Sequence, residues 1–132
     1  TFDVGGLDAV LKRLTAKNRT QSIAVPVFDR NRDISLASAR LIDRETTVLL
    51  IEGNYLLLKD GPWSQLKKYF DLSVMVPCDE VTLRARLIAR WKNLNYNNKN
   101  ATIKVEQNDM LNAKLIIRES CSADVNLKWN ET

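Results

Sequence analysis

A single acidic residue ends an aliphatic run near the middle of the sequence. Residues 48–51 are wholly aliphatic, and Glu52, Gly53 and Asn54 follow them directly. A carboxylate at the tip of a buried strand can sit beside Mg²⁺, which prefers hard oxygen ligands and often keeps bound water. Gly53 lets the backbone turn tightly or come close to a phosphate. The same pattern also describes a solvated Glu at a strand end, and the pattern does not distinguish the two.

Arginines spaced along a predicted helix form a second candidate site. Arg86 and Arg90 are four residues apart and share one helix face, with Arg84 close by. Two cations on one face repel unless an anion lies between them, and guanidinium groups bind phosphate through paired hydrogen bonds. The alternative is an ordinary solvated basic face, which Glu80, one turn before Arg84, would favour.

The third candidate is a run of mixed chemistry after an extended segment. Phe28, Asp29 and Arg30 place an aromatic ring, a carboxylate and a cation in consecutive positions. Carboxylates accept hydrogen bonds from sugar hydroxyls, and an aromatic face can cover a sugar ring, so this loop can hold a polyhydroxylated substrate. The alternative is an ordinary turn with Phe28 in the core.

Three polar residues interrupt a helical pattern of apolar residues later in the chain. Asn108, Asp109 and Asn112 are of types that form helices poorly. They indicate either a site or a bend, and the sequence offers no mechanism for them.

The composition removes several classes of protein. The chain of 132 residues has no histidine, which excludes zinc sites built on histidine and Ser-His or Cys-His catalytic pairs. Its two cysteines make no disulfide framework, so we expect a reduced, cytoplasmic setting. No apolar run approaches the roughly 20 residues that cross a bilayer. The net charge of +4 can attract phosphates, on a small anionic substrate or on nucleic acid.

The elements that would position these residues alternate between helices and strands. Asp3 and Asp79 are predicted N-caps, because a carboxylate accepts hydrogen bonds from the free N–H groups of a first helical turn. Pro62 suits the first position of a helix. The predicted helices are 5–17, 62–69, 80–92 and 101–119, and the predicted strands are 23–28, 40–42, 46–51, 72–76 and 123–129.

This order predicts one α/β domain over residues 1–132 with a mostly parallel sheet. The uninterrupted run 46–51 is typical of a strand buried on both faces. In such sheets ligands gather at the carboxyl ends of strands, which again indicates Glu52. On the two long helices we expect apolar stripes that face the core: Val81, Leu87, Ile88 and Trp91, then Val105, Met110, Leu111 and Leu115.

The order of the short motifs resembles that of P-loop kinases of the uridine kinase/phosphoribulokinase/pantothenate kinase superfamily. The similarity begins at residues 1–3, continues through 26–29, Glu52–Gly53, 77–79 and the Arg86 to Arg90 helix, and ends at 122–125. It covers nearly the whole chain in order. Within the superfamily, residues 52–58 and 108–112 look closest to bacterial proteins labelled as fructose-transport-system kinases and to related fungal proteins.

The resemblance implies a three-layer, parallel-sheet fold like that of P-loop nucleoside-triphosphate hydrolases. It also implies phosphoryl transfer from ATP with Mg²⁺ to a hydroxyl of a small molecule, by positioning and charge stabilisation. The residues implied are Glu52 beside the metal, Arg86 and Arg90 as catalytic lid arginines near the phosphates, Phe28, Asp29 and Arg30 at the substrate, and Gly53, Asn54 and Asp124 at the nucleotide.

Two departures from the family pattern limit this prediction. Phe28 stands where uridine kinases have Tyr, which puts nucleoside specificity in doubt. No Gly-x-x-x-x-Gly-Lys-Ser/Thr loop occurs in the sequence, and the family's upstream Asp base is also missing. Both would precede Thr1, so we expect an incomplete fold without the N-terminal strand: the C-terminal two-thirds of a kinase, inactive by itself.

The alternatives come from other classes of protein. A non-catalytic nucleotide- or partner-binding module would also explain the missing loop, and an ATPase without an acceptor is a further possibility. Nucleic-acid binding through the arginine helix is disfavoured, because Trp91 suits the helix core better. A missing strand would expose a sheet edge. We therefore expect a homodimer through that edge, or a partner that supplies the missing half.

Overall fold

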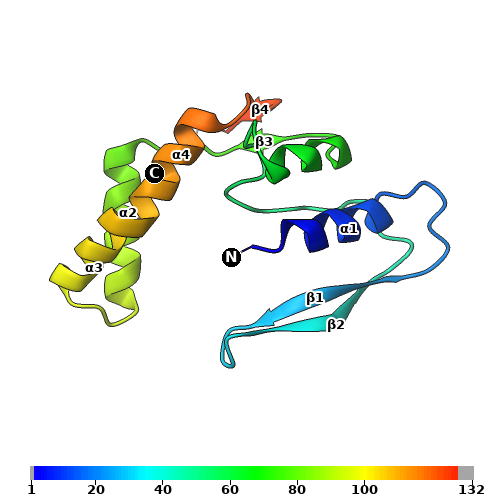
Figure 1. Cartoon of the computed structure of the whole chain (residues 1–132), viewed down its shortest axis with the longest axis horizontal. Coiled ribbons are helices and arrows are strands. Elements are labelled where there is room, and N and C mark those ends of the chain that lie inside the picture. The colour runs from blue at the N-terminus through cyan, green and yellow to red at the C-terminus, as the bar shows by residue number, and fades with distance from the viewer. Residues whose placement is uncertain (1, 128–132) are drawn as a thin grey trace.

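The computed structural model describes residues 2–127, and the elements run in the order shown in Figure 1. The fold is α/β, with one antiparallel and one parallel pair of strands. The elements are α1 (Val4–Leu14), β1 (Ile23–Asp29), β2 (Ile34–Ile42), the 3₁₀ helix η1 (Pro62–Tyr69), β3 (Val74–Met75), α2 (Glu80–Asn93), α3 (Asn98–Lys104), the π-helical turn η2 (Val105–Asp109), α4 (Met110–Glu119) and β4 (Val125–Asn126).

Helix α1 begins at the predicted cap and packs against η1. Asp3 Oδ1 accepts a hydrogen bond of 2.8 Å from the Gly6 N–H, which confirms the capping prediction. A side chain at Gly6 would collide with the Asp3 carboxylate, so glycine there permits the cap. The buried residues at this contact are Leu11 and Leu14 of α1 and Leu66 of η1.

Strands β1 and β2 form a long antiparallel hairpin that extends beyond α1 (Figure 1). The register pairs Ile23 with Ile42 and Asp29 with Ile34, and it is interrupted at Pro26, which has no N–H to donate. The prediction of a short strand at 40–42 was therefore too short: β2 covers nine residues. Nearly all of β2 is exposed, so no buried face marked it in the sequence.

Strands β3 and β4 form a short parallel pair, whereas the longer β1–β2 pair is antiparallel, so the described residues do not form a mostly parallel sheet. Val74 pairs with Val125, and Met75 pairs with Asn126. The Asp124 carboxylate joins the two strands by accepting hydrogen bonds from the Ser73 N–H at 2.8 Å and its hydroxyl at 2.5 Å. These two donors hold the pKa of Asp124 below its usual value. The last two residues of the predicted strand 123–129 lie outside the described residues.

The predicted strand at 46–51 is wrong for this structure. The segment follows a single path between α1 and β3 (Figure 1), and no strand within residues 2–127 pairs with it. Val48 is 81% exposed and Leu50 is 93% exposed, whereas Leu49 and Ile51 are half-buried. A strand is defined by its neighbours, and this segment has an aliphatic composition without a neighbour to pair with.

Helices α2, α3 and α4, with η2 between the last two, form a helical arm at one side of the molecule (Figure 1). The core of the arm is formed by Val105, Met110 and Ala113, against which Leu83, Leu87, Ile88 and Trp91 of α2 pack. Asp79 caps α2 as predicted, accepting from the Val81 and Thr82 N–H groups, and these bonds lower its pKa.

Three residues expected in the core of the arm are exposed. Val81 lies in the first turn of α2 and is 78% exposed, and Leu111 and Leu115 of α4 are also exposed. The π-helical turn adds a residue to the helical repeat and so rotates α4 relative to α3. As a result, Met110 is buried as expected, and Ala113 faces the core in place of Leu111 and Leu115. Within residues 2–127, none of the helices combines the length and the apolar character that crossing a membrane requires.

Candidate functional site

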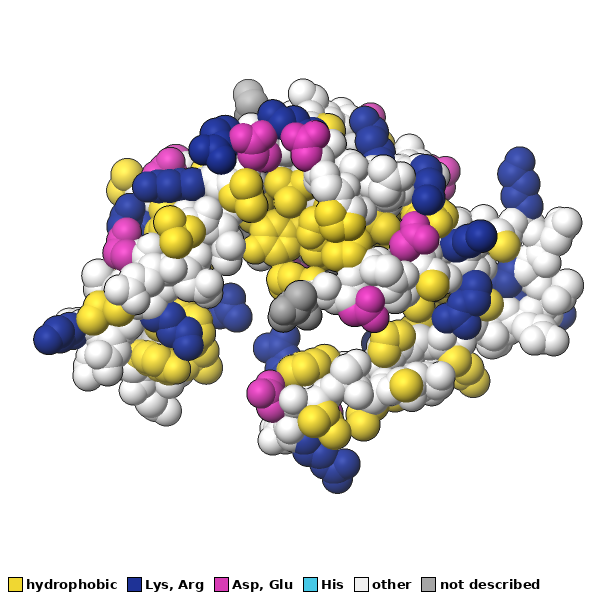
Figure 2. Space-filling model, in the orientation of Figure 1, with side chains coloured by type: hydrophobic (Ala, Val, Ile, Leu, Met, Phe, Trp, Pro, Cys, Tyr) yellow, Lys and Arg dark blue, Asp and Glu magenta, His cyan; other side chains and the backbone are white. Residues whose placement is uncertain are grey.

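A pocket of about 260 Å³ lies where the aliphatic segment ends. Glu52, Gly53 and Asn54 line this pocket together with residues from two other parts of the chain. Figure 2 shows apolar side chains gathered at the centre of one face, above the hollow between the helical arm and the hairpin. The complete lining is Phe2, Glu52, Gly53, Asn54, Tyr55, Leu56 and Trp63.

Three aromatic rings form one wall of this pocket. The ring centroids of Phe2 and Tyr55 are 5.6 Å apart, those of Phe2 and Trp63 5.8 Å, and those of Tyr55 and Trp63 5.4 Å. The Phe2 ring meets the Tyr55 and Trp63 rings edge to face, which is an electrostatically favourable arrangement of aromatic rings. Phe2 nevertheless remains 70% exposed. We call this group the aromatic triad.

Glu52 is exposed at the rim of the pocket. Within residues 2–127 no hydrogen bond or ion pair holds its carboxylate, and no cluster of three acidic or cysteine side chains able to hold a metal exists there. One unpaired carboxylate suits Mg²⁺, which uses one or two protein carboxylates together with water and phosphate oxygens. Gly53 allows close packing, because a Cβ there would lie 3.2 Å from Leu56 Cγ.

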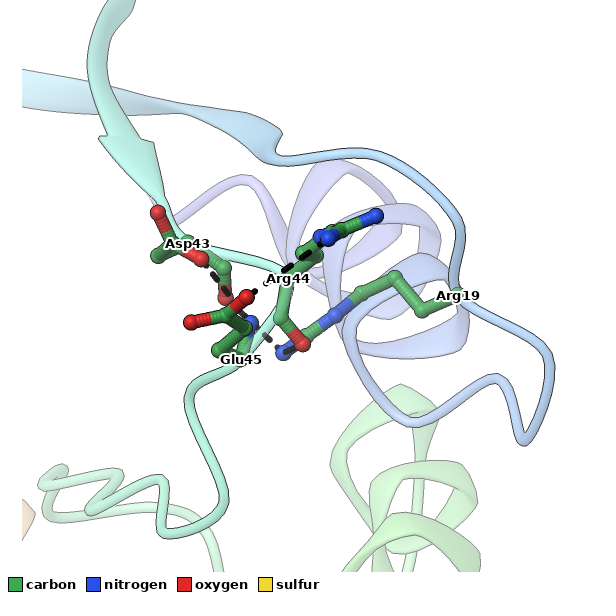
Figure 3. Close-up of polar contacts among 4 residues, drawn as sticks. All are labelled: Arg19, Asp43, Arg44 and Glu45. Carbon is green, nitrogen blue, oxygen red and sulfur yellow. Dashed lines mark hydrogen bonds and ion pairs between the residues drawn. The ribbon is translucent and has the colours of Figure 1, made fainter.

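Arg19 fixes the chain that leads into this segment (Figure 3). Its guanidinium donates to the carbonyls of Asp43 at 2.9 Å, Arg44 at 2.6 Å and Thr46 at 2.9 Å, and to Leu14 at the end of α1 at 3.2 Å. One side chain thus joins the C-terminus of α1 to the start of the aliphatic segment. Glu52 follows six residues after the last of these carbonyls.

The stretch after Glu52 is held at its other end by α4. The Leu57 carbonyl accepts from the Cys121 N–H at 2.7 Å, and the Glu119 carbonyl accepts from the Lys59 N–H at 3.0 Å. Lys59 Nζ also lies 2.8 Å from the Glu119 carboxylate. This ion pair raises the pKa of Lys59 and lowers the pKa of Glu119. The Glu52 loop is therefore anchored on both sides.

Arg86 and Arg90 lie on α2 in the helical arm and do not line the pocket. Both are exposed, and Arg86 Nη1 lies 4.0 Å from the Cys78 sulfur. Arg84 forms an ion pair with Glu106 of η2, so its charge is paired within the helical arm. The structure therefore leaves the proposed lid arginines apart from Glu52.

Phe28, Asp29 and Arg30 lie at the tip of the hairpin. Phe28 is 55% exposed, so it is not in the core as the alternative of an ordinary turn expected. Asp29 Oδ1 accepts from the N–H groups of Asn31 at 3.0 Å and Arg32 at 3.2 Å, so it stabilises the turn. These residues do not line the Glu52 pocket, and their role at a substrate stays a prediction.

Asp124, the remaining residue predicted to bind the nucleotide, has a structural role, because its hydrogen bonds with Ser73 join β3 and β4. A nucleotide role for it stays a prediction. The sequence reasoning missed Arg19 and did not connect Phe2, Tyr55 and Trp63, which are 53 and 8 positions apart along the chain. The only indication of these ring contacts in the sequence was that the three residues are aromatic, because residues this far apart in sequence show no local pattern.

The sequence matches no protein-family model. It is 28% identical to a Schizosaccharomyces pombe protein named "Putative uridine kinase C227.14" over 130 residues, which are 97% of this chain and 55% of that protein. It is 33% identical to the "ATP-dependent kinase-like protein notR'" of Aspergillus versicolor over 92 residues, which are 68% of this chain and 54% of that protein. The chain thus spans about half the length of these two relatives.

Two solved structures have the same fold. One is described as a "putative fructose transport system kinase" from Silicibacter sp. TM1040, with a TM-score of 0.87 and 33% identity over 97% of this chain and 61% of that one. The other, from Saccharomyces cerevisiae, is described as "a putative P-loop containing kinase with a circular permutation". Its TM-score is 0.66 over 83% of this chain and 36% of that one, and at 22% identity it supports the fold alone.

Proposed function

Because the chain belongs to the P-loop kinase superfamily that includes the uridine kinase-like proteins, we propose that it is the C-terminal part of an ATP-dependent small-molecule kinase. The observation that carries the proposal is the likeness to the Silicibacter kinase structure across 97% of the chain. The unpaired Glu52 at the pocket is the feature within this chain that suits the chemistry.

In this proposal Glu52 holds Mg²⁺, directly or through water, and Gly53 and Asn54 border the phosphates. The metal would supply positive charge that neutralises the phosphate oxygens. The acceptor's hydroxyl oxygen bonds to the γ-phosphorus while the bond from that phosphorus to the β–γ bridging oxygen breaks, and ADP leaves with the electron pair. The hydroxyl proton passes to a carboxylate base, which we expect outside residues 1–132.

Arg86 and Arg90 have the role of lid arginines that neutralise developing charge on the transferred group. They stand on α2, away from the pocket. The proposal therefore needs the helical arm to approach the Glu52 pocket when nucleotide binds. Closure of this kind is a common step in enzymes that exclude water from phosphoryl transfer.

The phosphate-binding loop has to come from a segment that this chain does not contain, so we propose that the 132 residues alone do not turn over ATP. The names of the relatives do not agree on an acceptor, since one mentions uridine and another fructose. A sugar, a nucleoside or a vitamin-like molecule all fit the coarse proposal. We place the protein in the cytoplasm, with ATP and a small hydroxyl compound as its partners.

The test uses the full-length gene product with Mg²⁺ and ATP against a panel of sugars, nucleosides and vitamins. We expect acceptor-dependent ADP formation that falls at least 100-fold in Glu52→Gln, because the metal loses its carboxylate. Glu45→Gln is the matched control, since Glu45 is an exposed acid whose ion pair with Arg44 lies outside the pocket. The 132-residue chain should show no turnover.

A full-length protein that neither binds nor hydrolyses ATP would overturn the kinase proposal in favour of a partner-binding module. ATP hydrolysis that no acceptor stimulates would favour the ATPase alternative. Oligonucleotide binding with a steep dependence on salt would favour the nucleic-acid alternative instead.

A further inference from the structure

The aromatic triad beside Glu52 also indicates where the acceptor binds and what kind of molecule it is. We propose that Phe2, Tyr55 and Trp63 form the acceptor subsite and that its ligand is an uncharged, single-ring sugar. This inference rests on the proposed kinase function and refines it.

The location follows from the requirements of phosphoryl transfer. Glu52 would hold the Mg²⁺ that accompanies the phosphates of ATP. The attacking oxygen of the acceptor has to lie about 3–3.5 Å from the γ-phosphorus. Glu52, the proposed metal ligand, lines the same pocket as the aromatic triad. A molecule bound against the triad is therefore next to the site where the γ-phosphate would lie.

The arrangement of the rings decides between two kinds of ligand. Aromatic rings that hold a cation surround it, so they leave a space between their faces. Here the centroids are only 5.4–5.8 Å apart, and the rings contact one another. They form one continuous apolar wall, with Phe2 still 70% exposed. Such a wall suits the flat C–H face of a sugar ring, which would cover the exposed ring surface.

The polar groups of the pocket suit hydroxyls. The Asn54 amide both donates and accepts hydrogen bonds, which suits sugar hydroxyls. No Lys or Arg is among the described residues that line the pocket, so none of them would pair with a carboxylate carried by an acceptor. The volume of about 260 Å³ is slightly below the roughly 300 Å³ at which pockets for drug-sized ligands begin. A single ring is therefore the ligand of matching size.

The hairpin tip is less suited to this task. The Asp29 carboxylate is already used by the backbone N–H groups of Asn31 and Arg32 and by an ion pair with Arg32 at 3.7 Å.

The test measures two quantities on the full-length protein: the acceptor KM in the ATP-coupled reaction, and direct sugar binding by saturation-transfer NMR without ATP. The acceptors are neutral hexoses, with uridine, thiamine and pantothenate as the other arms. Tyr55→Leu and Trp63→Leu should each raise the hexose KM at least tenfold while the KM for ATP stays within twofold. Tyr55→Phe keeps the ring and should keep the KM.

Tyr96→Leu is the matched control, because Tyr96 makes a similar edge-to-face contact, with Trp91, but lies in the helical arm. Circular dichroism shows whether the Leu variants fold. A hexose KM that is unchanged in both Leu variants would overturn the subsite while leaving the kinase proposal intact. A preference for pantothenate or thiamine would overturn the neutral-sugar assignment.

The two proposals fail in different ways. If no acceptor stimulates ADP formation but hexose binding is seen by NMR and lost in Tyr55→Leu, the sugar site stands and the kinase proposal falls. If turnover occurs with a hexose and sugar binding by NMR is unchanged in Tyr55→Leu and Trp63→Leu, the triad assignment falls alone.

Discussion

Arg19 holds the chain that leads into the Glu52 segment. Its guanidinium donates to four backbone carbonyls, three of them 24 to 27 residues away in the sequence. Guanidinium groups present several donors in a fixed plane, so they can satisfy several carbonyls at once. Without this side chain, the end of α1 and the turn at residues 43–46 lose their shared partner.

We expect Arg19→Ala to lower the free energy of unfolding of the 132-residue chain by about 1.5–3 kcal/mol, the usual range for hydrogen bonds to a charged group. Arg19→Lys should recover only part of this, because an ammonium group lacks the fork geometry. Urea denaturation measures the change. Arg13→Ala is the control, since exposed Arg13 donates to one carbonyl, that of Ala24 at 3.2 Å. Equal losses in the two alanine variants would contradict the role of Arg19.

Residue-level prediction worked where the relevant contact is local. Asp3 and Asp79 were predicted as caps, and both are, because a cap contacts N–H groups only two or three residues away. Glu52, Gly53 and Asn54 line one pocket because they are consecutive, and their role at metal and nucleotide stays a prediction. Arg19 was missed because its acceptors are distant backbone atoms, which leave no mark in the sequence.

At the scale of elements, Asp109 now has a role that the sequence did not indicate. Asp109 Oδ2 accepts a hydrogen bond of 2.6 Å from Trp91 Nε1, across from η2 to α2. Lys104 Nζ lies 4.3 Å from the centroid of the Trp91 ring, a cation–π contact on the same side chain. Trp91 is therefore the point at which α2 is joined to α3 and η2.

Asp109→Ala should destabilise the arm by about 1.5–3 kcal/mol, because the half-buried indole N–H loses a charged acceptor. Asp109→Asn keeps an acceptor oxygen and should lose less. Thermal unfolding measures stability, and the tryptophan emission should shift to longer wavelength as Trp91 gains contact with water. Gln107→Ala is the control, since Gln107 is exposed in the same turn. An emission spectrum unchanged in Asp109→Ala would argue against the contact.

The helices were predicted better than the strands. Helices 80–92 and 101–119 were expected close to their observed positions, because caps and apolar spacing are local signals. The π-helical turn was not expected, and it is the reason that Leu111 and Leu115 point away from the core. Strand β2 was largely missed, because it has no buried face and depends on pairing with β1.

At the scale of the whole molecule, two aliphatic segments expose apolar side chains to solvent. Val48 and Leu50 are exposed in the segment 46–51, and Leu72, Val74 and Val76 are exposed along β3 and its flanks. Neither segment carries a charged residue, and charges are a usual means of protecting an exposed edge. We propose that these surfaces are covered by a further strand, which in the isolated chain comes from a second copy.

The isolated 132-residue chain should therefore self-associate, and we expect Leu50→Lys to shift it toward monomer at the same concentration. A buried lysine without a partner is costly, so the charge opposes pairing at this segment. Sedimentation velocity over a range of concentrations measures the effect. Leu41→Lys is the control, because Leu41 is 68% exposed in a strand that is already paired. A wild-type chain that stays monomeric at all concentrations would contradict the proposal.

Sequence alone was enough for the features that depend on neighbouring residues: the α/β class, both aspartate caps and the main helices. The tertiary structure alone decided which distant residues meet. It brought Phe2 and Trp63 to Tyr55, set the Arg19 carbonyl contacts, rotated α4 through the π-helical turn and left 46–51 without a partner. The physical reason is that caps and helical periods act over a few residues, whereas pockets and strand pairs depend on chain segments far apart in sequence.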